Sequence, residues 1–127
     1  IEGMPGPGDM VRLLTAEGEF VAWGLFNPNS AIRVRLYSWH EDCSLTDQFW
    51  TDCVTRAVVT RQRIFGDGPE MRACRLIFSE GDGLSGLTVD RYGNYLLVRR
   101  FHIKHRREIA VLKNGMSEKE TCLQLTA

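Results

Sequence analysis

Turn-forming residues divide this chain into short apolar segments, and this division limits the folds that are open to it. Segments 9–15, 19–26 and 31–37 are each long enough for one strand, and turn signals at 16–18 and 27–30 separate them. Short strands joined by tight turns are typical of a small barrel or sandwich. No segment approaches the roughly 20 apolar residues that a membrane-spanning helix needs. We therefore expect a β-rich start and no membrane partner.

The third segment alternates between apolar and polar positions, which predicts one buried and one exposed face. The exposed face carries cations and aromatic rings, namely Arg33, Arg35, Tyr37 and then Trp39 in the same register. Guanidinium groups can hold phosphates while rings stack on unpaired bases. The pattern is compatible with RNA contact. An ordinary exposed strand face that pairs with Glu41 and Asp42 is the alternative.

A helix is predicted over 46–65, because apolar residues recur there at helical spacing. Ser44 or Thr46 can cap its start, and Asp47 suits the positive end of the helix dipole. Gly66-Asp67-Gly68-Pro69 is a stop signal. This helix would link the first strands to the rest of the chain.

The remainder of the chain predicts a second small sheet. Segments 72–79, 86–91 and 95–101 have the pattern of strands, with a hairpin turn at 92–94. Gly93 and Asn94 can both adopt positive φ in such a turn. A helix is predicted over about 103–113, and the tail TCLQLT could form a short closing strand.

A glycine-rich stretch, 79–94, raises the question of a phosphate-binding loop. Residues 81–86 fit the pattern G-x-G-x-x-G, but the sequence that follows has the pattern strand-turn-strand. Without a helix N-terminus there is no dipole to hold a pyrophosphate. We therefore predict that the glycines form a turn between strands and bind no nucleotide.

A basic cluster covers 99–107, with five arginine or lysine residues and two histidines. A solvated surface is the ordinary role of such a cluster, but cations at the start of the predicted helix oppose its dipole. An anionic partner such as a phosphate backbone is therefore an equal alternative. His102 and His105 could share a metal at helical spacing, but the adjacent arginines disfavour a cation, so we predict no metal site.

Composition excludes several classes of protein. Sixteen basic and sixteen acidic residues give no net charge, so any attraction to nucleic acid must be local. The four cysteines form no C-x-x-C pair, which favours reduced thiols in a cytoplasmic protein over zinc or disulfides. The start, Ile-Glu-Gly-Met, has no signal-peptide pattern. No nucleophile lies in a catalytic motif, so we predict no catalytic residues.

Two stretches, FVAWGLFNPNSAIRVRLYSW and CRLIFSEGDGLSGLTVDRYGNYLLVRRF, resemble the bacterial ribosomal RNA large-subunit methyltransferase I family. That family is similar to 5-methylcytosine methyltransferases. The first stretch carries a pattern that the family places in a PUA-type RNA-binding barrel, matched here by Ala22, Gly24, Asn27, Pro28, Ser30, Ile32, Arg33 and Arg35. The second stretch matches the following small α/β domain from Arg75 to Gly93. Residues 102–127 match the family poorly.

The resemblance implies an α+β chain with a truncated PUA-like β-barrel, a linking helix and a small α/β domain of ββα type. We expect these parts at 1–43, 44–69 and 70–127. The Rossmann-like domain of the family, with its S-adenosylmethionine site and catalytic cysteine, would lie outside these residues, so we expect no cofactor in this chain. Cys122 is not that cysteine.

The function implied is recognition of ribosomal RNA for a SAM-dependent (cytosine-C5) methyltransferase, with no activity of the chain alone and with room for a homodimer of the full-length protein. The candidate RNA-binding residues are Asn27, Arg33, Arg35, Tyr37, Arg99, Arg100, Lys104, Arg106 and Arg107. A stand-alone, non-catalytic RNA-binding or ribosome-associated module is the alternative. A small metal-dependent enzyme using His102 and His105 is a third hypothesis.

Overall fold

The computed structural model describes residues 3–101 and 107–113. It is an α+β structure with two antiparallel sheets and one long helix, and it divides into two units, residues 1–52 and 53–127. Each unit is described here by itself. The predicted division at 1–43, 44–69 and 70–127 stays a prediction.

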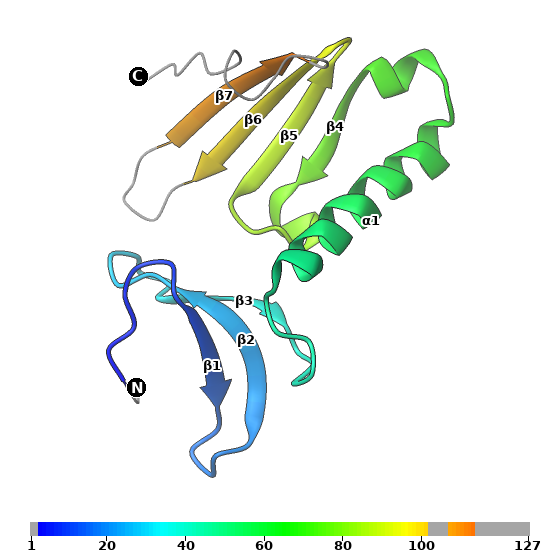
Figure 1. Cartoon of the computed structure of the whole chain (residues 1–127). Coiled ribbons are helices and arrows are strands. Elements are labelled where there is room, and N and C mark those ends of the chain that lie inside the picture. Colours follow the sequence, from blue (N-terminus) through cyan, green and yellow to red (C-terminus); the bar gives the residue numbers. More distant parts are fainter. Residues whose placement is uncertain (1–2, 102–106, 114–127) are drawn as a thin grey trace. The chain divides into compact units, whose positions relative to one another are not determined.

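The first unit contains a three-stranded antiparallel sheet in the order β1 (Met10–Leu14), β2 (Phe20–Phe26) and β3 (Val34–Ser38) (Figure 1). The three predicted strands are confirmed, but β3 begins later than predicted. Residues before it form a turn, in which the Asn27 amide donates to the Arg33 carbonyl over 2.7 Å. The described strands form an open sheet, so the structure does not show the predicted barrel.

Gly24 allows β2 and β3 to approach closely. A Cβ atom at this position would lie 2.6 Å from Cγ1 of Val34 and 2.7 Å from the backbone oxygen of Arg35. Both distances are shorter than side-chain contacts tolerate, so only glycine fits without a shift of β3. Ala22 and Phe26, on either side of it in β2, are buried in the core of this unit.

The helix α1 (Asp47–Phe65) begins and ends where local chemistry predicts. The Phe49 amide donates to Oγ1 of Thr46 over 3.3 Å, which makes Thr46 the N-cap. At the other end, Gly66 adopts a φ of 60° and its amide donates to the Gln62 carbonyl. Among the described residues, no helix is long and apolar enough to cross a membrane.

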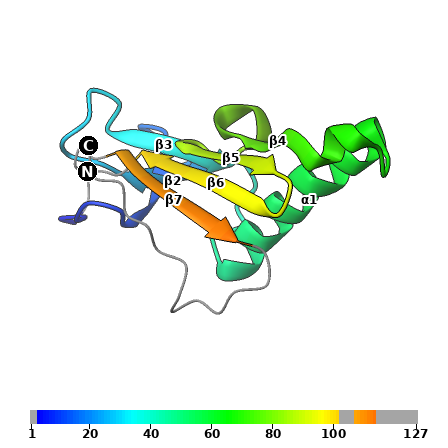
Figure 2. The same ribbon diagram turned by 90° about the horizontal axis from the view of Figure 1, so that it is seen from above.

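The second unit contains a four-stranded antiparallel sheet. Its strand order is β4 (Ala73–Phe78), β5 (Leu87–Tyr92), β6 (Tyr95–Phe101) and β7 (Arg107–Lys113). Figure 2 shows this order from above, with β7 at the edge opposite β4. Two short 3₁₀ helices, η1 (Pro69–Arg72) and η2 (Ser79–Asp82), flank β4. The core of this unit consists of Cys53, Ala57, Met71, Leu76, Ile77, Leu84 and Val89.

The predicted hairpin between β5 and β6 is present, but its loop has two residues, Gly93 and Asn94, and Tyr92 belongs to β5. Tyr92 lies opposite Tyr95, and Gly93 adopts a φ of 59°. Asn94 does not have a positive φ, although its side chain would tolerate one. Positive φ at the first loop position alone is the requirement of a type II′ turn.

The helix predicted over 103–113 is wrong, because residues 107–113 form β7. This strand pairs with β6 along its whole length, from Phe101 opposite Arg107 to Tyr95 opposite Lys113. The backbone groups of β6 offer seven pairing positions, and the β-branched Ile109 and Val111 favour a strand. The weak helical pattern could not compete with this pairing. The predicted closing strand in the tail lies outside the described residues.

The close approach at Gly24 gives a testable expectation. Gly24→Ala should lower the free energy of unfolding of the first unit by roughly 1–3 kcal/mol, because the new methyl group overlaps Val34 and the Arg35 carbonyl. Gly6→Ala is the matched control, since a Cβ there has its nearest neighbour, Oδ2 of Asp9, at 3.5 Å. Urea denaturation followed by tryptophan fluorescence measures both. Equal stability of the two variants would contradict the expectation.

Candidate nucleic-acid interface

The predicted strand face that carries Arg33, Arg35 and Tyr37 is shorter in the structure than the sequence pattern predicts. Arg35 lies on β3 opposite Leu25, whereas Arg33 is exposed in the turn before the strand. A register shift between β2 and β3 places Ser38 opposite Trp23, so Ser38 rather than Trp39 follows on the face of Arg35. The predicted continuous register through Trp39 is therefore wrong.

Aromatic packing fixes the end of this face. The Tyr37 ring meets the Trp50 ring edge-on, with their centroids 5.0 Å apart. Tyr37 is therefore held as part of a small aromatic cluster, in which Trp50 also contacts Phe49 at 5.0 Å. Trp39 remains largely exposed.

Two further residues near this face have clear local partners. Asn27 uses its side-chain oxygen to accept the amide of Asn29 at 3.0 Å, so it shapes the turn that carries Arg33. Glu41, one of the two acids in the alternative reading, forms an ion pair with Arg12. The RNA contacts predicted for Asn27, Arg33, Arg35 and Tyr37 stay predictions.

In the second unit, an ion pair connects α1 to the glycine-rich segment. Both terminal nitrogens of Arg61 donate to the two oxygens of Asp82, over 2.5 and 2.7 Å. Nε of Arg61 donates to the Arg75 carbonyl over 3.1 Å. Asp82 also accepts the Phe78 amide at 2.6 Å. The pair is mostly buried, with 15% and 11% of the two side chains exposed.

A second cluster lies on β4, β5 and β6. Asp90 accepts from Nε of Arg75 over 2.7 Å and from its terminal nitrogen over 3.1 Å. Arg99 on β6 donates to the same carboxylate. Asp90 is buried, whereas about two-fifths of each arginine side chain is exposed. Two cations on one carboxylate leave this cluster with a net positive charge. We call Arg75, Asp90 and Arg99 the β-sheet triad.

These contacts shift the acidity of both carboxyl groups. The hydrogen bond from Arg75 lowers the pKa of Asp90 and, together with the bond from Arg99, outweighs burial. Burial alone would raise the pKa of Asp82, but the hydrogen bonds from Arg61 and the Phe78 amide hold it below its ordinary value. The bond to Asp90 also raises the pKa of Arg75. All three groups are therefore charged at neutral pH.

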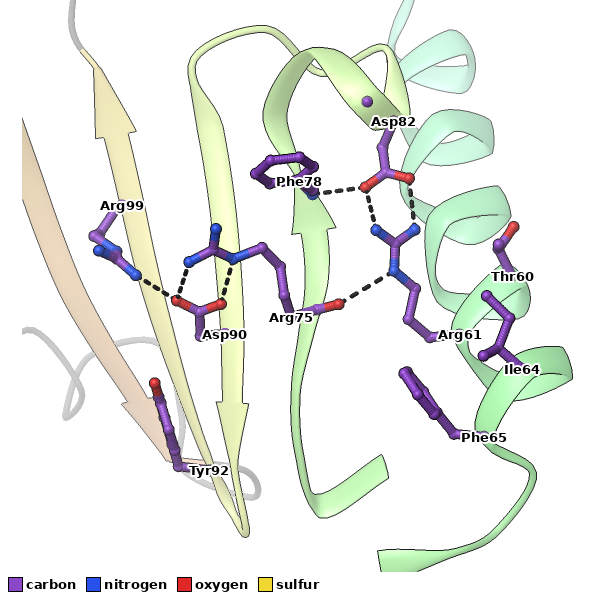
Figure 3. Close-up of a pocket in the computed structure, with 11 residues that line it drawn as sticks. Thr60, Arg61, Ile64, Phe65, Arg75, Phe78, Asp82, Asp90, Tyr92 and Arg99 are labelled. Atoms are coloured by element: carbon purple, nitrogen blue, oxygen red, sulfur yellow. Dashed lines mark hydrogen bonds and ion pairs between the residues drawn. The ribbon is translucent and has the colours of Figure 1, made fainter. Parts of the chain in front are cut away.

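Both ion-pair clusters line one open hollow of about 760 Å³. Figure 3 shows the side chains of these two clusters. The size of the hollow is within the range of small-molecule sites, about 300–1,000 Å³. Helix α1 contributes Thr60, Arg61, Ile64 and Phe65 to it. The remaining lining residues are Arg75, Phe78, Gly81, Asp82, Asp90, Tyr92 and Arg99. Phe78 lies beside the triad, with Cζ of Arg75 5.4 Å from the centre of its ring.

The glycine-rich segment forms a turn, as its sequence predicts. Three of its backbone amides already have acceptors: Gly83 donates to the Glu80 carbonyl, Leu84 to the Ser79 carbonyl and Gly86 to Oγ of Ser79. A phosphate-binding loop needs such amides to be available. The element that follows is strand β5, which is not a helix.

The structure separates the predicted residues of the basic cluster. Arg99 belongs to the β-sheet triad, whereas Arg100 lies opposite Leu87 on the other face of β6. Arg107 is the first residue of β7. Lys104, Arg106, His102 and His105 lie outside the described residues. Within the described part of the chain, no group of histidine, cysteine or acidic residues is placed to hold a metal.

Sequence reasoning missed Arg61, Arg75 and Asp90 as a connected set. The Arg61–Asp82 and Arg75–Asp90 pairs join residues 21 and 15 positions apart along the chain, so local patterns do not reveal them. One signal was present, since Asp90 is an acid within a short predicted strand, where a carboxylate is uncommon. A buried carboxylate in such a position needs a cationic partner.

Comparisons with known proteins assign the class of the first unit. A family model described as a PUA-like domain matches residues 1–39.

Two solved structures share the fold over most of this chain. One, a candidate SAM-dependent methyltransferase from Streptococcus mutans, has a TM-score of 0.65 at 19% identity over 79% of this chain and 26% of its own. The other, a candidate methyltransferase complexed with SAH, has a TM-score of 0.66, 19% identity and coverages of 78% and 26%. The family-model match makes the first unit PUA-like, and the two solved structures show a shared fold alone.

Curated relatives give the family. The protein named ribosomal RNA large subunit methyltransferase I from Alteromonas mediterranea is 35% identical over 112 residues, which are 86% of this chain and 28% of the relative. The protein of that name from Pseudoalteromonas translucida is 32% identical with the same coverage. The chain is a homologue of these methyltransferases, as its two motifs indicate, and spans about a quarter of their length.

The Arg61–Asp82 pair gives a stability prediction. Arg61→Met should lower the free energy of unfolding of the second unit by roughly 3 kcal/mol, because it leaves a mostly buried carboxylate without its counter-ion. Adding Asp82→Asn should recover part of this loss, since asparagine needs no counter-ion and still accepts the Phe78 amide. Arg63→Met, on an exposed position of α1, is the control and should change stability by less than about 0.5 kcal/mol. Urea denaturation followed by circular dichroism measures the free energy of unfolding of each variant. If the effects of the two single substitutions simply add in the double variant, the pairing is contradicted.

The lowered pKa values of Asp82 and Asp90 predict acid sensitivity. Such groups add stability that is fully present above the pKa of the unfolded chain, about 3.9, and is lost as the pH falls through the folded value. Hydrogen exchange of β5 amides should therefore be slow from pH 7 to about 5, after correction for intrinsic rates, and protection should fall below about pH 4. Asp90→Asn should lower protection at pH 7 and flatten this dependence. An unchanged acid profile in that variant would show that Asp90 is not the titrating group.

Proposed function

We propose that this chain recognises and positions ribosomal RNA for SAM-dependent methylation of a cytosine C5. The observation that supports it most is the homology to ribosomal RNA large subunit methyltransferase I over most of this chain. The PUA-like match includes the turn and the strand that carry Arg33 and Arg35. Methyl transfer would be carried out by the part of the relatives that this chain does not cover. The cytoplasm is the proposed location, and a homodimer of the full-length protein stays a prediction.

The arginines of the first unit would contribute positioning. Arg33 is exposed at the end of a turn that two hydrogen bonds of Asn27 hold in shape. Arg35 follows on β3, where Gly24 keeps the neighbouring strand close. Cations on a supported backbone suit phosphates, whose contacts set the register of a nucleic acid without reading its bases. A stand-alone RNA-binding module would use the same surface.

The test is binding of the chain to a ribosomal RNA fragment at increasing salt. Each phosphate contact contributes about 0.7 to 0.9 to the slope of log K against log salt. Arg33→Ala with Arg35→Ala should therefore weaken binding and reduce the slope by about 1.4 to 1.8. Arg56→Ala with Arg63→Ala removes the same charge from exposed positions of α1 and should leave the slope nearly unchanged. Affinity that does not vary with salt would contradict the proposal.

A further inference from the structure

The β-sheet triad shares its face of the sheet with three aromatic rings. Phe78 lies opposite Thr88, which is on the same face as Asp90 and Tyr92 because alternate residues of β5 point the same way. Tyr95 lies opposite Tyr92 across the hairpin. The pairing register therefore gathers Phe78, Tyr92 and Tyr95 on the face of the two arginines. Figure 3 shows Phe78 and Tyr92 on either side of the triad.

These rings are exposed although the unit has an apolar core. The exposed fractions are 54% for Phe78, 57% for Tyr92 and 48% for Tyr95. On the opposite face of the sheet, Ile77 and Val89 are buried. The sheet thus has one core face and one face that presents rings to solvent. Clustered exposed aromatic side chains mark binding surfaces, because burying them gains free energy that the monomer leaves unused.

The charge on this face is positive and held in place. Asp90 fixes the guanidinium groups of Arg75 and Arg99 but neutralises only one of the two charges. Nε of Arg99 is buried and has no acceptor within the described part of the chain. Because both arginines are already oriented, a phosphate that binds them costs little further side-chain entropy.

We propose that this face binds unpaired bases of single-stranded RNA, with Phe78 and Tyr92 as stacking surfaces and Arg75 and Arg99 as phosphate contacts. The inference rests on the proposed function, which supplies RNA as the partner, and it adds a second contact site on the second unit. Open, flat rings on a sheet can stack only on bases that leave the helix, since duplex RNA keeps its bases paired and stacked. Net positive charge beside the rings favours a polyanion over an apolar protein surface.

The experiment compares a labelled single-stranded RNA of about 12 nucleotides with the same sequence in a duplex, both titrated with the whole chain. Wild type should prefer the single strand. Phe78→Leu keeps an apolar side chain but removes the ring, and it should weaken single-strand binding roughly tenfold, since stacking contributes about 1–3 kcal/mol per base. Tyr92→Leu should act similarly, and Phe78→Trp should retain affinity. The salt dependence should not change, and circular dichroism checks that each variant is folded.

The outcomes separate this inference from the proposed function. Unchanged single-strand affinity in folded Phe78→Leu and Tyr92→Leu overturns the inference, and the face then fits a protein partner that needs only apolar contact. If Arg33→Ala with Arg35→Ala still reduces ribosomal RNA binding in that case, the proposed function stands alone. If the wild-type chain binds neither RNA, both fail. Val54→Ala, an exposed apolar change on α1 outside the lining of the hollow, controls for general loss of apolar surface.

Discussion

The second unit depends on a single guanidinium group that connects three elements. Arg61 of α1 donates to Asp82 in η2 through both terminal nitrogens and to the Arg75 carbonyl on the edge strand β4. A further contact of 3.4 Å reaches the Ala57 carbonyl of its own helix. An arginine can satisfy this many acceptors in one plane, which a lysine cannot. The helix, the edge strand and the glycine-rich turn therefore hold their positions together, and the exposed side chains of β4 are placed by the same contact.

The residue types of the glycine-rich segment are the ones that this arrangement requires. Asp82 anchors the turn from inside, and Gly83 reverses the chain with a φ of 70°. Ser79, the one non-glycine described residue with positive φ, accepts the Gly86 amide with its hydroxyl group. A motif that looks like a nucleotide loop by its letters is thus a turn whose polar groups satisfy one another. Its function is to start β5 at the residue that brings Asp90 opposite Arg75.

The sequence allowed good prediction of elements whose ends are set by local chemistry. Thr46, Gly66 and Gly93 each act within a few residues of their own position, and each was found where the pattern placed it. The strand at 107–113 was missed because its pairing partner β6, rather than its own sequence, decides its conformation. The bulge that moves Trp39 out of register likewise depends on β2. The Arg61–Asp82 and Arg75–Asp90 ion pairs join residues too distant in sequence for a local pattern to show.

The triad also explains how a buried acid can belong to the face that we propose for RNA. A carboxylate on an RNA-binding face would repel phosphate if it were exposed and unpaired. Asp90 is buried beneath two arginines, so the groups that reach solvent are cationic while the acid orients them. An exposed arginine would lose considerable rotamer entropy on binding, but these two have lost part of it on folding. Asp90 thus converts two flexible cations into a fixed pair beside Phe78, at the cost of one unit of charge.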